Sequence, residues 1–458
     1  MNLIVKFSLG GDFARKKSMV SPTQDFTARN LGWMRRHRRQ FGLKPDSGKL
    51  PKEKDEWSEF LGNLEARIAR ETFDFGKLTL ASISKKGKTK QVVATKSLDE
   101  VLVLRRMNEN IRRSYGIKNP NRDALLRTLQ QALAENTQKN IFRLDIKSCF
   151  ESISRHSVYS ELVADGRVSF QTLSLLNILF EALDKMPRKV ARKGLPRGLA
   201  ISSTMAEIVL NKLERDIRQV PGVYVVLRYV DDLVVITTKV ESGIEKIIKE
   251  LAANYRLKLN VRKSSLALIA CECDFLCGHG DSCPCLKACK CQQKSISLEY
   301  LGYSIYLSNR NSISGKNSIV VRLSKGKLAK IKTRIMVVAR EYIKTGDAGL
   351  LSRRLELLTG NLQMMDSDGS RGLSVGLSYT HSSYGIESKD EIFALGDLNE
   401  LNFFMRRSLA FAMHLRPPSA GIKKKIYKYS FVSGFHSKRR VKLKATAISV
   451  VSECWRHA

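Results

Sequence analysis

The sequence predicts an α/β protein with a mainly helical region toward its C-terminus. Residues 76–310 alternate runs of strand-forming residues with helix-like runs, which is the pattern of an α/β fold. Residues 324–364 instead place apolar side chains at helical spacing, at Leu328, Ile331, Ile335 and Val338. We expect three regions: a basic N-terminal region (1–75), an α/β part (76–310) and a helical, then basic, C-terminal part (311–458).

The charge of the chain predicts a polyanionic partner. The 458 residues carry 80 Lys and Arg against 44 Asp and Glu, a formal net charge of +36. A balance so far from zero favours binding to nucleic acid first and to an anionic membrane surface second. Two segments, "WMRRHRRQFGLK" and "KKKIYKYSFVSGFHSKRRVKLK", mix basic with aromatic residues. Such segments grip a phosphate backbone and stack bases, or else form solvated charged faces.

The sequence predicts no membrane anchor. No apolar run reaches the roughly 18 residues that a spanning helix needs. The apolar stretch in MNLIVKFSLGG is too short for a signal peptide. We therefore expect a cytoplasmic protein that binds nucleic acid.

The stretch "RYVDDLVVITTK" (228–239) predicts a hairpin with an unusual turn. The strand-forming runs 223–230 and 233–238 leave Asp231 and Asp232 as the two turn residues. A tight hairpin normally has Asn-Gly or Asp-Gly there, because both turn residues must adopt positive φ. This turn instead sets two like charges side by side.

A third aspartate gives this turn a chemical reason. Asp145 ends a short predicted strand, 141–146, and a helix-like stretch follows it. Three converging carboxylates repel one another unless divalent cations lie between them, and Mg²⁺ prefers oxygen ligands. Two such ions stabilise the attacking and leaving oxygens of an in-line phosphoryl transfer. The alternative is that the turn aspartates are exposed and bind no metal.

A set of motifs in one order resembles those of the reverse transcriptases. "YVDD" matches their active-site signature, and Asp145 with Phe150 matches the first metal-binding motif. "GLPRGLAISSTMAEIVLNKLERDI" (194–217) matches the Pro-x-Gly turn and helix between them. That helix is predicted independently: Ser202 or Ser203 caps it, and an apolar face is formed by Met205, Ile208, Val209 and Leu213. "LKLNVRKSS" (257–265) resembles the fourth motif and "LEYLGYSI" (298–305) the primer-grip hairpin. Upstream, "ISKKGKTKQVVAT" (83–95) resembles the fingers hairpin.

The resemblance implies a right-hand polymerase, with fingers and palm over 76–310 and a thumb from about residue 324. Asp145, Asp231 and Asp232 would hold two Mg²⁺ ions, or Mn²⁺ in their place, and the carbonyl of Ile146 would add a ligand. Further roles follow by motif. The residues that would bind the incoming nucleotide are Lys85, Lys90, Phe150, Arg197, Gly198 and Lys263. The primer end would lie on Leu301, Gly302 and Tyr303. Each lysine taken alone has a simpler interpretation as a solvated charge.

One position departs from the family pattern. The middle turn usually reads Pro-Gln-Gly, and here Arg197 stands between Pro196 and Gly198. An arginine at this position places a positive charge close to the template and the nucleotide and would alter how the template base is held. The sequence therefore supports phosphoryl transfer more strongly than it supports ordinary copying of a template. Untemplated, terminal-transferase-like synthesis is therefore an alternative function.

Within the family, the chain resembles the bacterial antiphage (defence-associated) group. "YGIKNPNR", "LPRGLAISSTMAE", "LLTGN" and "VGLSY" carry this likeness, which is nearest to the type 3 systems that pair two polymerases with a small RNA. Retron and group II intron enzymes are the rivals. The resemblance implies DNA synthesis from dNTPs on an RNA template, a dedicated non-coding RNA, together with a second polymerase subunit or an oligomer as partners. An inactive RNA-binding scaffold is the third alternative, against which the intact aspartates argue.

A cysteine-rich insertion lies between the fourth motif and the primer-grip hairpin. Its eight candidate ligands are Cys271, Cys273, Cys277, His279, Cys283, Cys285, Cys289 and Cys291. A local cluster with few apolar residues favours structural Zn²⁺, one or two ions, over free thiols or an iron–sulfur cluster. Cys149, at a strand–helix junction, is expected to be a small buried apolar residue.

Overall fold

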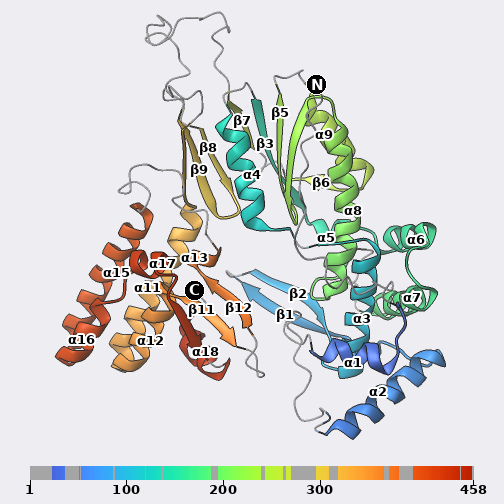
Figure 1. Cartoon of the computed structure of the whole chain (residues 1–458), viewed down its shortest axis with the longest axis horizontal. Helices are drawn as coiled ribbons and strands as arrows, with labels where there is room; N and C mark the ends of the chain where they lie inside the picture. Colours follow the sequence, from blue (N-terminus) through green and yellow to red (C-terminus); the bar gives the residue numbers. More distant parts are fainter. Residues whose placement is uncertain are drawn as a thin grey trace, which may run out of the picture. The chain divides into compact units, whose positions relative to one another are not determined.

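The computed structural model describes most of the chain as two compact units of mixed helix and sheet (Figure 1). The described residues are 23–36, 51, 53–85, 88–118, 120–135, 139–186, 194–238, 243–260, 265–269, 296–308, 318–365, 371–380, 396–443 and 445–455. The first unit comprises residues 1–81, 91–117 and 153–208, and the second comprises 82–90, 118–152 and 209–458. Each unit is described separately below.

The first unit is built mainly from helices. Its helices are α1 (Ala28–Arg36), α2 (Lys54–Ala69), α3 (Leu98–Ser114), α6 (Arg155–Asp165), α7 (Phe170–Asp184) and the first half of α8 (Ala200–Gln219). Two serines cap helices here, because Ser154 accepts from Ser157 N in α6 and Ser169 from Thr172 N in α7. Two buried side chains of α3, Arg106 and Asn110, donate hydrogen bonds to backbone carbonyls of residues 23–25, just before α1.

A two-stranded hairpin has residues 79–81 and 91–94 in the first unit and the rest in the second. It consists of β1 (Thr79–Lys85) and β2 (Lys88–Ala94), which pair with each other. This confirms that residues 83–95 form a hairpin, as the sequence predicts.

The second unit is organised around an antiparallel sheet. Its strands are β3 (Lys139–Lys147), β4 (Val223–Tyr229), β5 (Asp232–Thr238), β6 (Lys258–Leu259) and β7 (Ser265–Ile269). The order is β4-β5-β3-β6, and β7 also pairs with β3. Helices α4 (Arg122–Ala134), α5 (Cys149–Ser152) and α9 (Ile244–Asn254) belong to the same unit. Residues Leu233–Thr237 of β5 are all buried, so this strand is covered on both faces.

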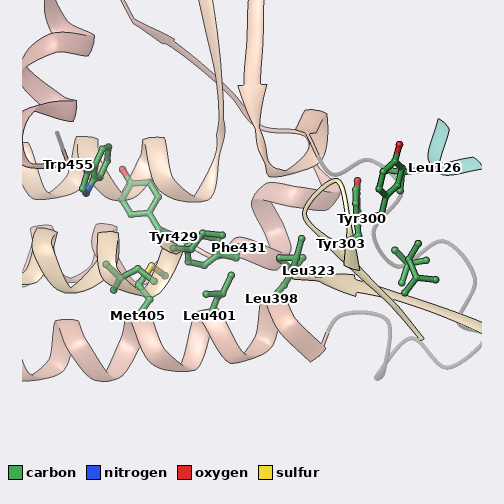
Figure 2. Close-up of a cluster of buried hydrophobic side chains, with 14 of the residues drawn as sticks. Leu126, Tyr300, Tyr303, Leu323, Leu398, Leu401, Met405, Tyr429, Phe431 and Trp455 are labelled. Atoms are coloured by element: carbon green, nitrogen blue, oxygen red, sulfur yellow. The ribbon is translucent and has the colours of Figure 1, made fainter. Parts of the chain in front are cut away.

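A second antiparallel sheet and a group of helices complete the core of this unit. The sheet consists of β8 (Ile296–Tyr300), β9 (Tyr303–Ser308) and β10 (Ser318–Leu323). The long helices are α11 (Lys325–Thr345), α12 (Ala348–Thr359) and α15 (Gly396–Leu415). Figure 2 shows part of the shared apolar cluster, which includes Leu126, Tyr300, Tyr303, Leu323, Leu398, Leu401, Met405, Tyr429, Phe431 and Trp455.

The C-terminal part adds a small mixed sheet. Its order is β12-β11-β13, with β11 (Asn361–Met365), β12 (Arg371–Gly376) and β13 (Arg440–Leu443), and β11 runs parallel to β13. The short helices of this part are α13 (Leu377–Thr380), α16 (Ala420–Tyr427), α17 (Phe431–His436), α18 (Ala445–Ser452) and the 3₁₀ turn η4 (Glu453–Trp455).

Several expectations about individual elements are tested by these bounds. Of the predicted apolar positions of α11, Ile331, Ile335 and Val338 are buried, and Leu328 is half-buried against the same apolar cluster. The helical stretch ends earlier than expected, because residues 361–364 belong to β11. Cys149 is buried, as expected.

The start of α8 differs from the prediction. The expected caps lie inside the helix, which begins at Ala200, and Ser203 Oγ donates to the carbonyl of Ala200 at 2.8 Å. The expected apolar face of α8 is correct: Met205, Ile208, Val209 and Leu213 are buried. Within the described ranges, no helix is long and apolar enough to cross a bilayer.

Candidate active site

Two of the three predicted aspartates are direct neighbours in the sheet of the second unit. Asp145 lies near the end of β3, and Asp232 is the first residue of β5 and its register partner. Directly paired residues project from the same face of an antiparallel sheet. Asp231 precedes Asp232 in the β4–β5 turn, and its carbonyl accepts from Ile146 N on β3 at 3.1 Å. The fold therefore brings the three aspartates to one end of β3 and β5.

The turn lies one residue earlier than the sequence predicts. Tyr229 pairs with Asp232, so the two turn residues are Val230 and Asp231, and Asp232 belongs to the strand. Val230 has φ of +60° and is 37 % exposed. A β-branched residue rarely adopts positive φ, and such backbone strain costs about 1–3 kcal/mol. We refer to Val230 and Asp231 as the β4–β5 turn.

The electrostatics of Asp232 show that the three carboxylates lie close enough to interact. Burial raises the pKa of Asp232, and the negative charges of Asp145 and Asp231 raise it further. Arg143 opposes this rise, because it donates to both carboxylate oxygens of Asp232, Nε to Oδ1 at 3.3 Å and Nη2 to Oδ2 at 3.2 Å. The site concentrates negative charge that one arginine partly neutralises.

Sequence reasoning missed two residues that hold the aspartates. Arg143 is two residues before Asp145, so the alternation of the strand places both on one face, and that spacing is the signal that predicts it. Asn260 follows β6. Its backbone N–H donates to the Asp145 carbonyl at 2.7 Å, and its Nδ2 donates to Asp145 Oδ2 at 3.3 Å.

The donor set suits a hard divalent cation in its chemistry. Three carboxylates and nearby backbone carbonyls are the oxygen ligands that Mg²⁺ prefers. Among the described side chains, no three acidic, histidine or cysteine groups converge as a formed metal site requires. In this arrangement Asp232 is turned toward Arg143.

Phe150 lies five residues after Asp145 along the chain. Ser148, with φ of +48°, turns the chain from β3 into the short helix α5 that carries Phe150. The Phe150 side chain is half-buried, whereas its neighbour Cys149 is buried in the core.

The Pro-Arg-Gly turn belongs to the first unit and is seated on β2. The Arg197 carbonyl accepts from Val93 N at 2.7 Å. Gly198 has φ of +103°, and a Cβ there would overlap the Val93 carbonyl oxygen. Only glycine fits this position without a shift of the backbone.

The hairpin predicted at 298–305 is present in the second unit. Strands β8 and β9 pair, and Leu301 and Gly302 form the turn with φ of +49° and +79°. The Tyr303 side chain is buried. Arg122 was not predicted from sequence: its guanidinium donates to the Leu301 carbonyl and lies 5.7 Å from the Tyr303 ring centroid. Only a contact between segments 179 residues apart identifies it.

Some predicted residues lie outside the described part of the chain. These are Lys263, the insertion 271–291 with its eight candidate zinc ligands, residues 37–44 of the basic segment that begins at Trp33, and the side chains of Lys85 and Lys90. Trp33 is described, and the guanidinium of Arg113 lies 5.3 Å from its ring centroid.

The comparison with known families identifies the chemistry. Residues 83–305, just under half of the chain, match the family model described as reverse transcriptase (RNA-dependent DNA polymerase). The chain contains a reverse transcriptase domain. It is therefore an RNA-directed DNA polymerase, and the matched range spans every motif from the hairpin at 83–95 to the β8–β9 hairpin. No curated protein matches the chain significantly.

This reverse transcriptase domain sets the general requirements of the enzyme. The family implies dNTP substrates, an RNA template and a DNA product, and reverse transcriptases generally use Mg²⁺. The three aspartates and the β8–β9 turn lie inside the matched range.

Proposed function

We propose that Asp145, Asp231 and Asp232 form the catalytic centre of this RNA-directed DNA polymerase and hold two Mg²⁺ ions. The observation that carries the proposal is the register of the sheet, in which Asp145 and Asp232 are paired and Asp231 is adjacent. Bound Mg²⁺ would stabilise the attacking and leaving oxygens of in-line phosphoryl transfer. The Ile146 carbonyl would add a further ligand.

The protein's own side chains position the reactants. Phosphoryl transfer needs mainly orientation and charge from a protein, and lysines supply charge for the triphosphate. We assign this role to Lys85 and Lys90 of the fingers hairpin, and a phosphate-binding or proton-donating role to Lys263. Arg197 and Gly198 would border the template and the incoming nucleotide.

Two further assignments concern the sugar and the primer. The Phe150 ring would pack under the incoming sugar and exclude a 2′-hydroxyl, which makes the product DNA. Its half-buried side chain supports this role, because a core residue would be enclosed. The β8–β9 turn, with Leu301, Gly302 and Tyr303, would seat the primer end.

We infer a right-hand arrangement with fingers and palm over 76–310, preceded by a basic region (1–75) and followed by a helical thumb and basic C-terminal region (311–458). The template is a dedicated non-coding RNA, the role is antiphage defence in the cytoplasm, and a second polymerase subunit or a further copy is the protein partner. The net charge of +36 supports nucleic-acid binding. Structural Zn²⁺ in the cysteine-rich insertion is part of this proposal, and elemental analysis of purified protein tests it.

The catalytic assignment is tested by Asp231→Asn with Asp232→Asn. We expect loss of dNTP incorporation with RNA affinity nearly unchanged, because the amides keep the shape but not the charge that binds cations. The matched control is Glu245→Gln with Glu250→Gln on α9, two exposed carboxylates in pairs that contribute little. It makes the same change in net charge and should retain synthesis. Synthesis by the aspartate variant would refute the assignment.

A second experiment separates templated from untemplated synthesis. The protein is purified from its host, and the RNA bound to it and the DNA it makes are both sequenced. DNA complementary to one bound RNA supports copying of a dedicated template. DNA unrelated to any bound RNA would support the terminal-transferase-like alternative.

A further inference from the structure

The β4–β5 turn has little to hold it in place apart from polar contacts. Val230 is in the left-handed region with a branched side chain, and that side chain is 37 % exposed, so packing does not fix it. Asp231 and Asp232 follow with adjacent negative charges, and Asp145 lies opposite. Backbone strain and charge repulsion both favour opening of this turn.

A buried arginine in β4 opposes that opening. Arg228 Nη1 donates to the Val230 carbonyl at 3.2 Å. The same guanidinium also binds two side chains of α8: Nε donates to Glu214 Oε2 at 2.9 Å, and Nη2 donates to Asn211 Oδ1. The Arg228 side chain is only 5 % exposed, so these hydrogen bonds form away from bulk water and are strengthened by that burial.

We propose that Arg228 is a positioning residue for DNA synthesis, which ties the β4–β5 turn to α8 and so fixes Asp231 and Asp232. This inference rests on the proposed catalytic role of those aspartates. Arginine is suited to the task because its planar fork reaches three acceptors at once, whereas lysine is a single point charge. Through Glu214 and Asn211, the rigid helix α8 sets the position of the turn.

The chain offers a matched control for this clamp. Arg218 also donates to Glu214, through Oε1 at 2.8 Å, and to a β4 carbonyl, that of Val226 at 2.6 Å. It therefore links the same helix to the same strand without contacting the turn. Arg228→Lys and Arg218→Lys remove equivalent links, and only the first loosens the turn.

The experiment measures single-nucleotide incorporation on a primed RNA template, with hydrogen exchange of residues 223–238 and thermal unfolding of the same preparations. For Arg228→Lys we expect kcat to fall about 10- to 100-fold, because small displacements of reacting groups have effects of this size. The KM for dNTP should change less than about threefold, since the nucleotide-binding residues are untouched. Exchange should rise at the turn and not along α8. Arg218→Lys should stay close to wild type in all three measurements.

A second variant guards against a general loss of folding. Glu214→Gln keeps the Arg228 side chain but weakens its tether, and it should lower kcat by a smaller factor. Adding it to Arg228→Lys should produce little further loss, because the two residues act through one contact. Equal losses in Arg228→Lys and Arg218→Lys, or wild-type kcat in Arg228→Lys, would overturn the proposal. Asp231→Asn with Asp232→Asn is assayed alongside: if it remains active, the proposed function fails, whereas if it is inactive while Arg228→Lys is normal, only this inference fails.

Discussion

Replacing Gly198 with alanine tests whether the Pro-Arg-Gly turn is seated on β2 as the structure has it. Gly198 has φ of +103°, outside the regions that side chains tolerate. A Cβ there would overlap the Val93 carbonyl oxygen and lie 3.1 Å from the Val92 Cβ. Both obstacles belong to β2, and one of them is backbone.

The magnitude follows from three separate costs. The strained φ costs about 1–3 kcal/mol, and crowding of a close-packed contact costs a similar amount. Relief of the overlap by movement of β2 would break the hydrogen bond from Val93 N to the Arg197 carbonyl, worth about 1 kcal/mol. We expect Gly198→Ala to lower the free energy of unfolding of the first unit by roughly 3–7 kcal/mol.

Gly166→Ala is the matched control. Gly166 has φ of +61° at the end of α6, and nothing lies within 4 Å of a Cβ there. Its cost is conformational alone, about 1–2 kcal/mol. Urea unfolding followed by tryptophan fluorescence measures both variants, because Trp33 and Trp57 lie in this unit. Similar small losses for the two variants would refute the contact between the turn and β2.

Two further predictions concern selectivity and pH. Phe150→Val should admit ribonucleotides while dNTP incorporation falls only modestly. The control Phe142→Val, in the buried core of β3, should lower stability without changing selectivity. Paired dNTP and rNTP incorporation assays measure both variants, and an unchanged preference for dNTP in Phe150→Val would contradict the proposed role of Phe150. The Asp397 carboxylate accepts a hydrogen bond from Leu323 N at 2.8 Å, and burial raises the pKa of Asp397 in the folded protein. The stability that Asp397 contributes is therefore present below its unfolded pKa and is lost as pH rises through its folded pKa. Asp397→Asn keeps an acceptor and should remove that pH dependence, with stability at neutral pH equal to or above wild type; an unchanged pH slope in urea titrations would count against this.

Local sequence patterns predicted elements and their order, because those depend on periodicity within short segments. The apolar face of α8 and the buried side of α11 follow from spacing alone, whereas the hairpins at 83–95 and 298–305 were predicted from their resemblance to family motifs. The start of α8 was not predicted, because serine side chains mark caps only statistically and Ala200 begins the helix before them.

Most residues that position the aspartates and the β8–β9 turn could not be predicted from local sequence patterns. Arg122 reaches the Leu301 carbonyl across 179 positions, and Asn260 reaches Asp145 across 115. No periodicity connects such pairs, since the tertiary fold alone sets which segments meet. Arg143 could have been predicted, because strand alternation puts it on the same face of β3 as Asp145.

The one-residue displacement of the β4–β5 turn shows how a local rule was overridden. Propensity assigns Val230 to the strand and Asp232 to the turn, and the structure has the reverse. With both aspartates in the turn, neither would be paired with β3. With Asp232 in the strand, it lies directly opposite Asp145, and like charges paired in this way destabilise a sheet. Arg143 offsets part of that repulsion through both oxygens of Asp232. The sheet thus accepts strain at Val230 and repulsion at Asp232 in the same place, and a divalent cation bound there would relieve the repulsion while using the geometry that the strain maintains.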